Sequence, residues 1–438
     1  MIETHETGES ESSSSYPPSI QAGIPTLGTT PKGWTRFRLR DLIQGVERRA
    51  KLVDTESYQL VTAKRNRGGI VARAVLRGDQ IRTKTQFYVA GGDFLISNRQ
   101  VSHGAVGIVP VELDGALVSN EYTAFHTTEN IDLDFLNALS HSTYFQQTCF
   151  HSSIGVHVEK LVFRLEDWLA WEFDIPPLDQ QRRIVTVLAA WDRAIDGTQS
   201  LVAAKKYRKS GLVQKVFDDL PKKSLLEAAD VRFSGVDKKS VEGEQAVRLC
   251  NYTDVFEHPE ITANLKFMAA TATKRQIAAN RLRKHDVVFT KDSETASDIA
   301  ECALVAEDID NLVCGYHLGI ARPREAVCWG PYLAHALRHS DVRHQFSRLA
   351  NGVVRYGLTL DSLDQIEVPL PDLPVQRQIA TTLTTEDHGT TALFLRVTEL
   401  RNQKRGLMRK LLTGEWCLDE RFDADAHAYF RWASVGAT

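Results

Sequence analysis

The stretch IPPLDQQRRIVTVLAAW, residues 175–191, decides the fold, because the chain repeats its pattern as LPDLPVQRQIATTLTTE at residues 370–386. The two copies stay aligned without a gap from 176–217 to 371–412, at a constant offset of 195. The identical pairs include Pro176 and Pro371, Gln181 and Gln376, Asp192 and Asp387, and Lys209 and Lys404. An ungapped internal repeat of this length indicates a structure built from two related parts.

Each copy of the repeat predicts one long helix. Proline stands at its start, where a missing amide hydrogen costs nothing. Apolar residues then recur at alternating steps of three and four, which is the spacing of a coiled-coil seam. The predicted seam residues are Ile184, Leu188, Trp191, Ile195, Val202 and Leu212 in the first helix and Ile379, Leu383, Leu393, Val397, Leu400 and Leu407 in the second.

The two predicted helices are complementary. A helix this long with a single apolar stripe needs a partner, and each copy can supply the other. In an antiparallel pair, Trp191 would face about Leu400 and Lys205 would face about Glu386, so that apolar meets apolar and the polar pair is opposite in charge. We therefore expect this register. The alternative is that each helix packs only on its own globular domain.

A globular stretch of comparable length precedes each helix. GDFLISN (92–98) corresponds to HDVVFTK (285–291), and GALVSNEYTAF (115–125) corresponds to DNLVCGYHLGI (310–320). Alternating apolar strands, Gly-rich turns and short helices indicate the α+β class. We expect two α+β domains separated by two long antiparallel coiled-coil helices, in a pseudo-twofold internal repeat. The predicted parts are a disordered acidic tail (1–30), a first domain (31–172), a first helix (173–217), a second domain (218–366), a second helix (367–414) and a C-terminal tail (415–438).

Composition narrows the class of protein. The N-terminal tail has neither a basic start nor an apolar segment, so it does not resemble a secretory signal. The chain has no apolar run of about 18 residues, which argues against a membrane span. The six cysteines form no CxxC pair and the 14 histidines show no metal-ligand spacing. We expect a cytoplasmic protein without a metal site.

The charge of the chain is unevenly distributed. The net charge is −3, but residues 1–30 carry about −4 and residues 415–438 about −3, which leaves about +4 on the body. Residues 31–90 hold 14 Lys and Arg against 5 Asp and Glu. A local excess of this kind suits a phosphate backbone. A solvated basic face without a partner explains the charge alone equally well.

Cationic and amide side chains gather in or beside Gly-rich turns of both domains. Such side chains on loops can reach phosphates and base edges. In the first domain the predicted DNA contacts are Lys64, Arg65, Arg67, Arg73, Lys84, Asn98, Arg99 and His103. In the second they are Asn251, Tyr252, Lys274, Arg275, Lys291, Arg355 and Tyr356. Any one of them is more simply a surface residue, but the whole set, together with the repeat, favours DNA binding.

Motifs of the common catalytic classes are missing from the sequence. There is no phosphate loop ending in GK[ST], no HExxH and no GxSxG. No glycine-rich cofactor loop is paired with an aromatic methyltransferase tetrapeptide. We therefore expect no catalytic residues and no bound cofactor in this chain.

The pattern resembles the specificity subunit of type I restriction-modification enzymes. The resemblance rests on PPLDQQRRI (176–184) and PDLPVQRQI (371–379), on the stretch from GDFLISN to NEYTAF (92–125), and on LMRKLLTGEW (407–416). It covers about residues 31–416. It implies two target recognition domains, each reading one half of a bipartite DNA site, and a helix pair that sets the spacer between the halves.

The resemblance also implies partners. Two methyltransferase subunits would bind this chain and methylate adenine using S-adenosylmethionine, and restriction subunits would add an ATP- and Mg-dependent nuclease. The chain itself would catalyse nothing. The alternatives are the specificity subunit of a related defence complex or stand-alone methyltransferase, a fused modification enzyme, and a coiled-coil scaffold that no longer binds DNA.

One residue of the second helix departs from the family pattern. Gly389 lies in a run of threonines where the first helix has Ala194. Glycine inside a helix costs up to about 1 kcal/mol relative to alanine. The sequence therefore predicts a kink or break near residues 387–391.

Overall fold

The computed structural model describes residues 24–154 and 162–423. The chain divides into two compact units, one formed by the residues up to Thr198 and from Arg396 onward, the other by Gln199–Leu395. Each unit holds one globular domain and half of each long helix. The predicted N-terminal tail lies mostly outside the described residues, as does the chain beyond residue 423. In the described part of the chain, no helix is long and apolar enough to cross a membrane.

The domain of the first unit combines small sheets with short helices. Its helices are α1 (Leu133–Ser140), α2 (Thr143–His151) and α3 (Leu165–Leu169). Its strands are β1 (Thr35–Arg38), β2 (Ile43–Val46), β3 (Arg49–Ala50), β4 (Ser57–Ala63), β5 (Ile70–Arg77), β6 (Gln86–Tyr88), β7 (Phe94–Ser97), β8 (Val106–Ile108), β9 (Leu117–Ser119), β10 (Tyr122–Thr127), β11 (Ser153–Ile154), β12 (Val162–Phe163) and β13 (Glu172–Ile175). Two of its sheets have the orders β2-β10-β7-β8 and β3-β6-β9-β4-β5.

The domain of the second unit has the same mixed character. Its helices are α5 (Leu225–Ala228), α6 (Tyr252–Glu257), α7 (Lys274–Asn280), α8 (Gly330–Leu337) and α9 (Ser340–Leu349). Its strands are β14 (Lys222–Ser224), β15 (Ala229–Phe233), β16 (Gln245–Cys250), β17 (Glu260–Ile261), β18 (Met268–Ala272), β19 (Val287–Thr290), β20 (Asp292–Ser293), β21 (Cys302–Val305), β22 (Leu312–Cys314), β23 (Leu318–Pro323), β24 (Tyr356–Gly357) and β25 (Glu367–Pro369). Two of its sheets have the orders β15-β23-β19-β21-β17 and β18-β16-β22.

The strand pairings of the two domains correspond. β10 lies between β2 and β7, antiparallel to both, and β23 lies in the same way between β15 and β19. β4 pairs antiparallel with β5 and parallel with β9, as β16 does with β18 and β22. The corresponding sequence blocks suggested that the two domains are related, and the domains do share a strand topology.

A buried aspartate marks the same turn in both domains. Asp93 accepts a hydrogen bond from the Ala90 amide at 2.8 Å, and Asp286 accepts one from the Arg283 amide at 2.9 Å. Each aspartate residue is 1% exposed. Each aspartate also forms an ion pair with an arginine: Arg48 with Asp93 and Arg322 with Asp286, both at 2.6 Å. Breaking such a buried pair on one side is costly, so these aspartates hold the turn before the central strand of each domain.

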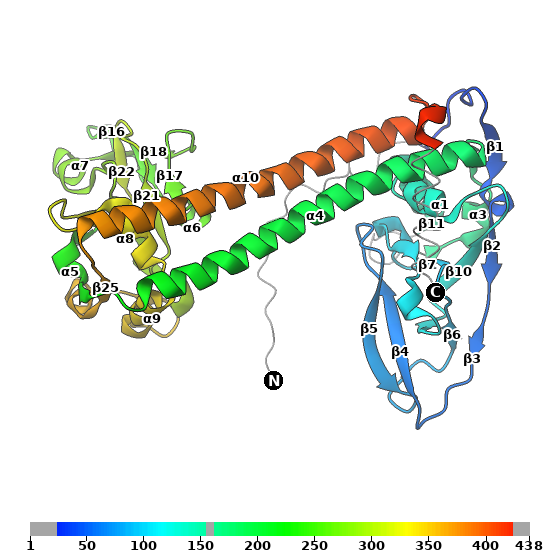
Figure 1. Ribbon diagram of the computed structural model, residues 1–438, viewed down its shortest axis with the longest axis horizontal. Helices are drawn as coiled ribbons and strands as arrows, with labels where there is room; N and C mark the ends of the chain where they lie inside the picture. The colour runs from blue at the N-terminus through cyan, green and yellow to red at the C-terminus, as the bar shows by residue number, and fades with distance from the viewer. Residues whose placement is uncertain (1–23, 155–161, 424–438) are drawn as a thin grey trace. The chain divides into compact units, whose positions relative to one another are not determined.

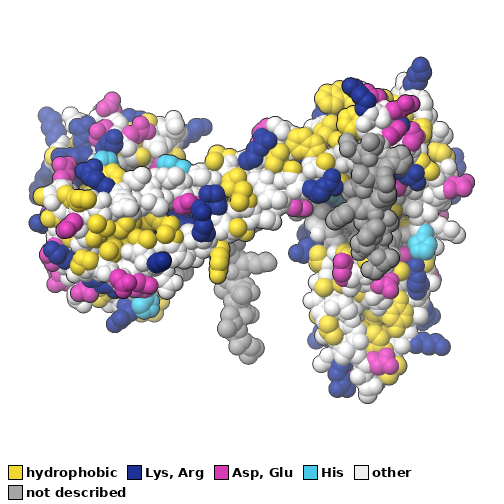
Figure 2. Space-filling model, in the orientation of Figure 1, with side chains coloured by type: hydrophobic (Ala, Val, Ile, Leu, Met, Phe, Trp, Pro, Cys, Tyr) yellow, Lys and Arg dark blue, Asp and Glu magenta, His cyan; other side chains and the backbone are white. Residues whose placement is uncertain are grey.

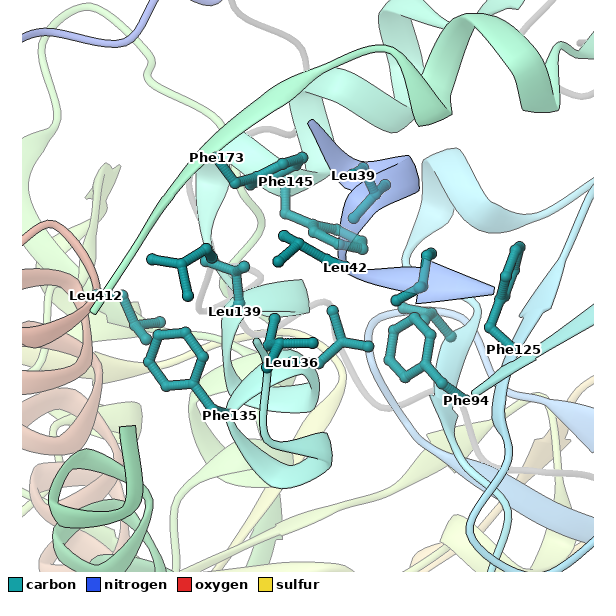
Figure 3. Packing of buried hydrophobic residues seen from close by; sticks show 14 of the residues in the cluster. Leu39, Leu42, Phe94, Phe125, Phe135, Leu136, Leu139, Phe145, Phe173 and Leu412 are labelled. Carbon is teal, nitrogen blue, oxygen red and sulfur yellow. The ribbon is translucent and has the colours of Figure 1, made fainter. Parts of the chain in front are cut away.

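The core of the first unit joins its domain to both long helices. Figure 3 shows Phe94, Phe125, Phe135 and Phe145 packed together, with Leu412 of the second long helix beside Phe135. The same cluster includes Ile184 and Leu188 of the first long helix. These two predicted seam residues therefore pack in the core of the domain.

The two repeats fold as the long helices α4 (Leu178–Phe217) and α10 (Leu373–Leu412), drawn in green and orange in Figure 1. Each contains 40 residues. The predicted break near residues 387–391 is wrong, because α10 continues through Gly389. Contacts of the two residues before the glycine offset its low helix propensity: Asp387 pairs with Lys209, and His388 lies 3.3 Å from Glu260.

Within each unit, α4 and α10 pack against each other in the predicted antiparallel register. In the first unit, Ile195, Val397 and Leu400 form a buried cluster against which Trp191 packs. In the second unit, Lys205 lies 3.3 Å from Glu386. The predicted register is confirmed by these contacts.

The other predicted seam residues lie in several environments. Ile379 and Leu383 belong to a buried cluster of the second unit that also contains Phe217 and Tyr332, with Leu212 packed against it. Leu407 packs against the core of the first unit. Val202 and Leu393 are half-buried.

Two ion pairs between the helices follow from the repeat itself. Lys404 pairs with Asp192 in the first unit, and Lys209 pairs with Asp387 in the second. Lys209 and Lys404 are equivalent positions of the repeat, as are Asp192 and Asp387. Each unit therefore contains one lysine–aspartate ion pair between α4 and α10, formed by equivalent positions of the repeat.

The repeated glutamine explains the motif with which each helix begins. Gln181 is fully buried, and its side-chain amide donates to the carbonyls of Asn130 and Pro176 and accepts from the amide of Asp132. Gln376, also fully buried, donates to Val327 and Pro371 and accepts from Trp329. Each glutamine ties the start of a long helix to the residues that lead into a short helix, α1 or α8.

The described part of the C-terminal tail packs on the start of α4. The Arg183 guanidinium forms ion pairs with Asp423 at 2.5 Å and with Asp179 at 3.1 Å. Leu418 packs against the core of the first unit. Residues up to Asp423 therefore extend that core beyond the end of α10.

Protonation of His335 couples the stability of the second unit to pH. Its Nε2 lies 2.9 Å from Oγ1 of Thr384, and burial lowers its pKa from 6.5 to about 3. The unfolded chain takes up this proton below about pH 6.5 and the folded chain does not, so stability present at neutral pH is lost as the pH falls toward 3. We expect a loss of about 2 kcal/mol in the free energy of unfolding between pH 7 and pH 5 from this residue.

Urea denaturation at pH 7 and pH 5 measures this loss. The variant His335→Gln keeps a hydrogen-bonding group but cannot titrate, so its loss between the two pH values should be smaller by that amount. Equal losses of stability in the unmodified chain and the variant would contradict the assignment of this pH dependence to His335.

Candidate nucleic-acid interface

Three loops of the first unit meet at one edge of the domain. Loop A joins β4 to β5 (64–69), loop B follows β7 (98–105), and loop C joins β9 to β10 (120–121). Asn66 and Arg67 of loop A donate their amides to the carbonyls of His103 and Gly104 in loop B, at 2.8 and 3.0 Å. The two loops are therefore held together by their backbones.

Local sequence explains the shape of loop A. Asn66 and Arg67 have φ angles of 56° and 61°, and Gly69 has a φ of 74°. Asparagine and glycine adopt this left-handed conformation at low cost, so the turn suits KRNRGG. Arg67 is the strained member, and strain of this kind is common where a side chain is held for a function.

Side chains of loops A, B and C also contact one another. Arg65 donates to Oε1 of Gln100 at 2.6 Å, which connects loop A to loop B. Arg99 lies 2.8 Å from Glu121, which connects loop B to loop C. The Arg99 side chain nevertheless remains 71% exposed.

The second unit builds the same site from different residues. Loop B follows β19 and contains Lys291 and Asp292, and loop C is the turn between β22 and β23. Helix α6 and its flanks, residues 251–267, take the place of loop A. The hydroxyls of Tyr252 and Ser293 are 3.3 Å apart, and His317 lies 2.8 Å from Asp292. Under the alignment of GDFLISN with HDVVFTK, Ser293 corresponds to Gln100 and Asp292 to Arg99.

A fourth segment joins this site in the second unit. β24 pairs with β20, and Arg355, next to Tyr356, donates to Oδ1 of Asp292 at 2.8 Å. Lys291 Nζ lies 4.3 Å from the centre of the Tyr316 ring, a cation–π contact. The site of the second unit thus combines two cations with aromatic rings.

Most of the predicted DNA contacts are brought together by these loops. They are Lys64, Arg65, Arg67, Asn98, Arg99 and His103 in the first unit and Asn251, Tyr252, Lys291, Arg355 and Tyr356 in the second. Arg73 lies on β5 and lines a cavity of about 490 Å³ beside Glu121 and Tyr122 of the first unit. Lys84 turns away to the Gly78 carbonyl, and Lys274 and Arg275 begin α7, outside these loops.

Sequence reasoning missed three residues of loop C. Glu121 pairs with Arg99, His317 pairs with Asp292, and Tyr316 stacks under Lys291. The signal was present, because the corresponding blocks 115–125 and 310–320 both contain this turn.

The hydroxyl of Tyr252 suits hydrogen bonding. Burial raises the pKa of the Tyr252 hydroxyl, so this group stays a neutral donor. Among residues 24–154 and 162–423, no group of three His, Cys, Asp or Glu could hold a metal ion. The site can therefore offer charge, amides and aromatic faces to a polar partner.

Comparison with known proteins finds a family model that matches part of the chain. Residues 251–396, which include loops B and C of the second unit, match the model of the type I restriction modification DNA specificity domain. The predicted resemblance to type I specificity subunits is confirmed. A curated relative, the putative type I restriction enzyme MjaX specificity subunit of Methanocaldococcus jannaschii, is 28% identical over 141 residues, which is 32% of this chain. The alignment spans about a third (33%) of that specificity subunit.

Solved structures extend the likeness to most of the chain. A type I restriction-modification S subunit from M. genitalium has a TM-score of 0.52 and 13% identity, covering 90% of this chain and 98% of its own. A chain from a structure of the complex assembly and conformational transition of the type I R-M system has a TM-score of 0.56 and 19% identity, covering 88% and 98%. At these identities the likeness concerns the fold, and it confirms the α+β domains with long helices.

Proposed function

We propose that this chain is a non-catalytic, sequence-specific DNA-binding subunit of a type I restriction-modification complex. Each unit would read one half of a bipartite site. The observation that carries the proposal is the recurrence of one loop arrangement in both units, with different side chains at equivalent positions. A protein with two copies of one reader and different contact residues suits a target with two different halves.

The chemistry of the loops supports readout of base edges. Arg99 and Asn98 are of the types that form paired hydrogen bonds with guanine and adenine in the major groove. Lys64 is exposed at the start of loop A and suits a phosphate. In the second unit, Lys291 and Arg355 supply the charge beside aromatic side chains.

The helix pair would serve the complex in two ways. Paired helices are stiff, so their length would set the number of unread base pairs between the half-sites. They would also dock two methyltransferase subunits, and apolar side chains exposed on their second-unit halves suit such a contact: Leu201, Tyr207, Phe394 and Leu395. Figure 2 shows hydrophobic side chains along the helix pair beside lysines and arginines. The partners would supply S-adenosylmethionine, ATP and Mg, and restriction subunits would join them.

Selection from a random duplex library tests the proposal. The full chain, co-expressed with a type I methyltransferase subunit of the same genome, should enrich two short sequences at a fixed separation. Binding to the selected duplex should weaken steeply as salt rises, because phosphate contacts release counterions. Enrichment of no sequence would refute sequence-specific binding.

Arg99 offers a residue-level prediction. The variant Arg99→Ala should weaken binding to the selected duplex by about 1–3 kcal/mol and relax the preference in one half-site only. Titration of duplexes altered at each position measures both effects. Arg77→Ala is the matched control, since Arg77 also pairs with an exposed acid, Asp79, and lies at the end of β5 remote from loop A. An equal effect in both half-sites would contradict the assignment of Arg99 to one reader.

A further inference from the structure

The turn before β24 exposes two valines to solvent. Val353 is 92% exposed and Val354 is 86% exposed, which makes them the most exposed large hydrophobic residues in the described part of the chain. Isolated exposed valines are common on protein surfaces, but an adjacent pair at a turn tip is a small apolar patch. Such a patch contributes nothing to the core of its own domain.

The turn that carries the two valines is held by backbone hydrogen bonds and an ion pair. Asn351 and Gly357 exchange two backbone hydrogen bonds of 2.9 Å, which close the turn at its base. Gly352 has a φ of 150°. A Cβ there would lie 1.9 Å from the Arg355 carbonyl oxygen, so only glycine allows the backbone at residue 352 to approach that of residue 355 this closely. The ion pair of Arg355 with Asp292 fixes the side of the turn to loop B.

The surroundings of the turn are those of the candidate interface. Tyr356, the next residue but one after Val354, pairs with Ser293 of β20. Lys291 of loop B and Tyr316 of loop C belong to this same candidate interface. The valines are therefore the apolar part of a surface that otherwise offers charge, hydroxyls and aromatic rings.

We propose that Val353 and Val354 contact the 5-methyl groups of thymines in the half-site read by the second unit. This inference rests on the proposed function. In the major groove every base pair presents polar atoms, and the thymine methyl is the apolar group among them. The χ1 rotamers of valine are restricted, so little side-chain entropy is lost when a hydrogen-bonded turn presents it. The turn would thus recognise thymine by burying its methyl group, whereas Arg99 in the other unit would recognise a base by hydrogen bonds.

Replacing thymine by deoxyuridine tests the contact directly, because it removes the methyl group alone. The complex with the unmodified chain should bind the selected duplex about fourfold less tightly for each contacted methyl that is removed. The effect should be confined to one half-site. Val353→Ser with Val354→Ser should bind the thymine duplex correspondingly less tightly and respond to deoxyuridine little or not at all.

Val241→Ser is the matched control, since Val241 is 52% exposed in the same unit and should leave the response to deoxyuridine unchanged. Equal binding of thymine and deoxyuridine duplexes by the unmodified chain would overturn the inference, as would a half-site without thymine. A chain that selects no sequence at all would instead refute the proposed function, and this inference with it. Selection of a bipartite site with no response to deoxyuridine would refute the inference alone.

Discussion

Replacing Gln181 by leucine will destabilise the first unit by about 3 kcal/mol or more. The substitution keeps the volume of the side chain roughly constant but removes all three of its hydrogen bonds. The carbonyl of Pro176 would then remain buried without that partner, and the half-buried bonds to the amide of Asp132 and the carbonyl of Asn130 would also be lost. Each unsatisfied buried group costs about 1–3 kcal/mol.

The second unit provides an independent copy of this experiment. Gln376 makes the equivalent contacts to Trp329, Val327 and Pro371, so Gln376→Leu should destabilise that unit by a similar amount. Urea denaturation of the full chain, followed by tryptophan fluorescence and by proteolysis of each unit, measures the two losses. Gln378→Leu is the control, because Gln378 is exposed and the change should stay within about 0.5 kcal/mol. A loss in the Gln181 variant no larger than this would contradict the role of the glutamine.

Deleting one heptad from both long helices will shift the preferred spacer by about three base pairs. Under the proposed function the helix pair fixes the separation of the half-sites. Seven residues span about 10.5 Å of helix, and one base pair rises about 3.4 Å. The observable is the number of unread positions between the two enriched sequences, read after library selection.

The register of the pair dictates which residues to remove. Residues 195–201 of α4 face residues 390–396 of α10 when Trp191 faces Leu400 and Lys205 faces Glu386. Removing both segments leaves these two contacts in register and shortens each apolar seam by two positions. Removing only 195–201 is the control, because it displaces one half of the seam and should lower the thermal stability sharply. An unchanged spacer in the double deletion would refute the idea that the helices measure it.

The helix pair was predictable because its determinants are local and periodic. The seam positions, the 195-residue offset and the opposite charges of Lys205 and Glu386 are all visible in the sequence. The break predicted at Gly389 failed because propensity is a local quantity. Contacts of Asp387 and His388 with residues far along the chain outweigh about 1 kcal/mol of helix propensity.

The candidate site was only partly predictable. Residue types pointed to Arg65, Arg99 and Tyr252, but their neighbours depend on which loops the sheets bring together. The contacts of Arg99 with Glu121 and of His317 with Asp292 join segments more than 20 residues apart, and no local pattern encodes them. The repeated Gln181 was recognised as a motif, whereas its role as a buried hydrogen-bonding group required the fold.

We propose that each unit reads one half of a bipartite DNA site. Sequencing of modified adenines, in cells that express this chain with its methyltransferase partner, tests it most directly. We expect methylation within two short specified sequences separated by a spacer of constant length and variable composition, and its loss when the chain is deleted. Methylation at a single contiguous sequence, or a pattern that the deletion leaves unchanged, would contradict the reading of two half-sites by the two units.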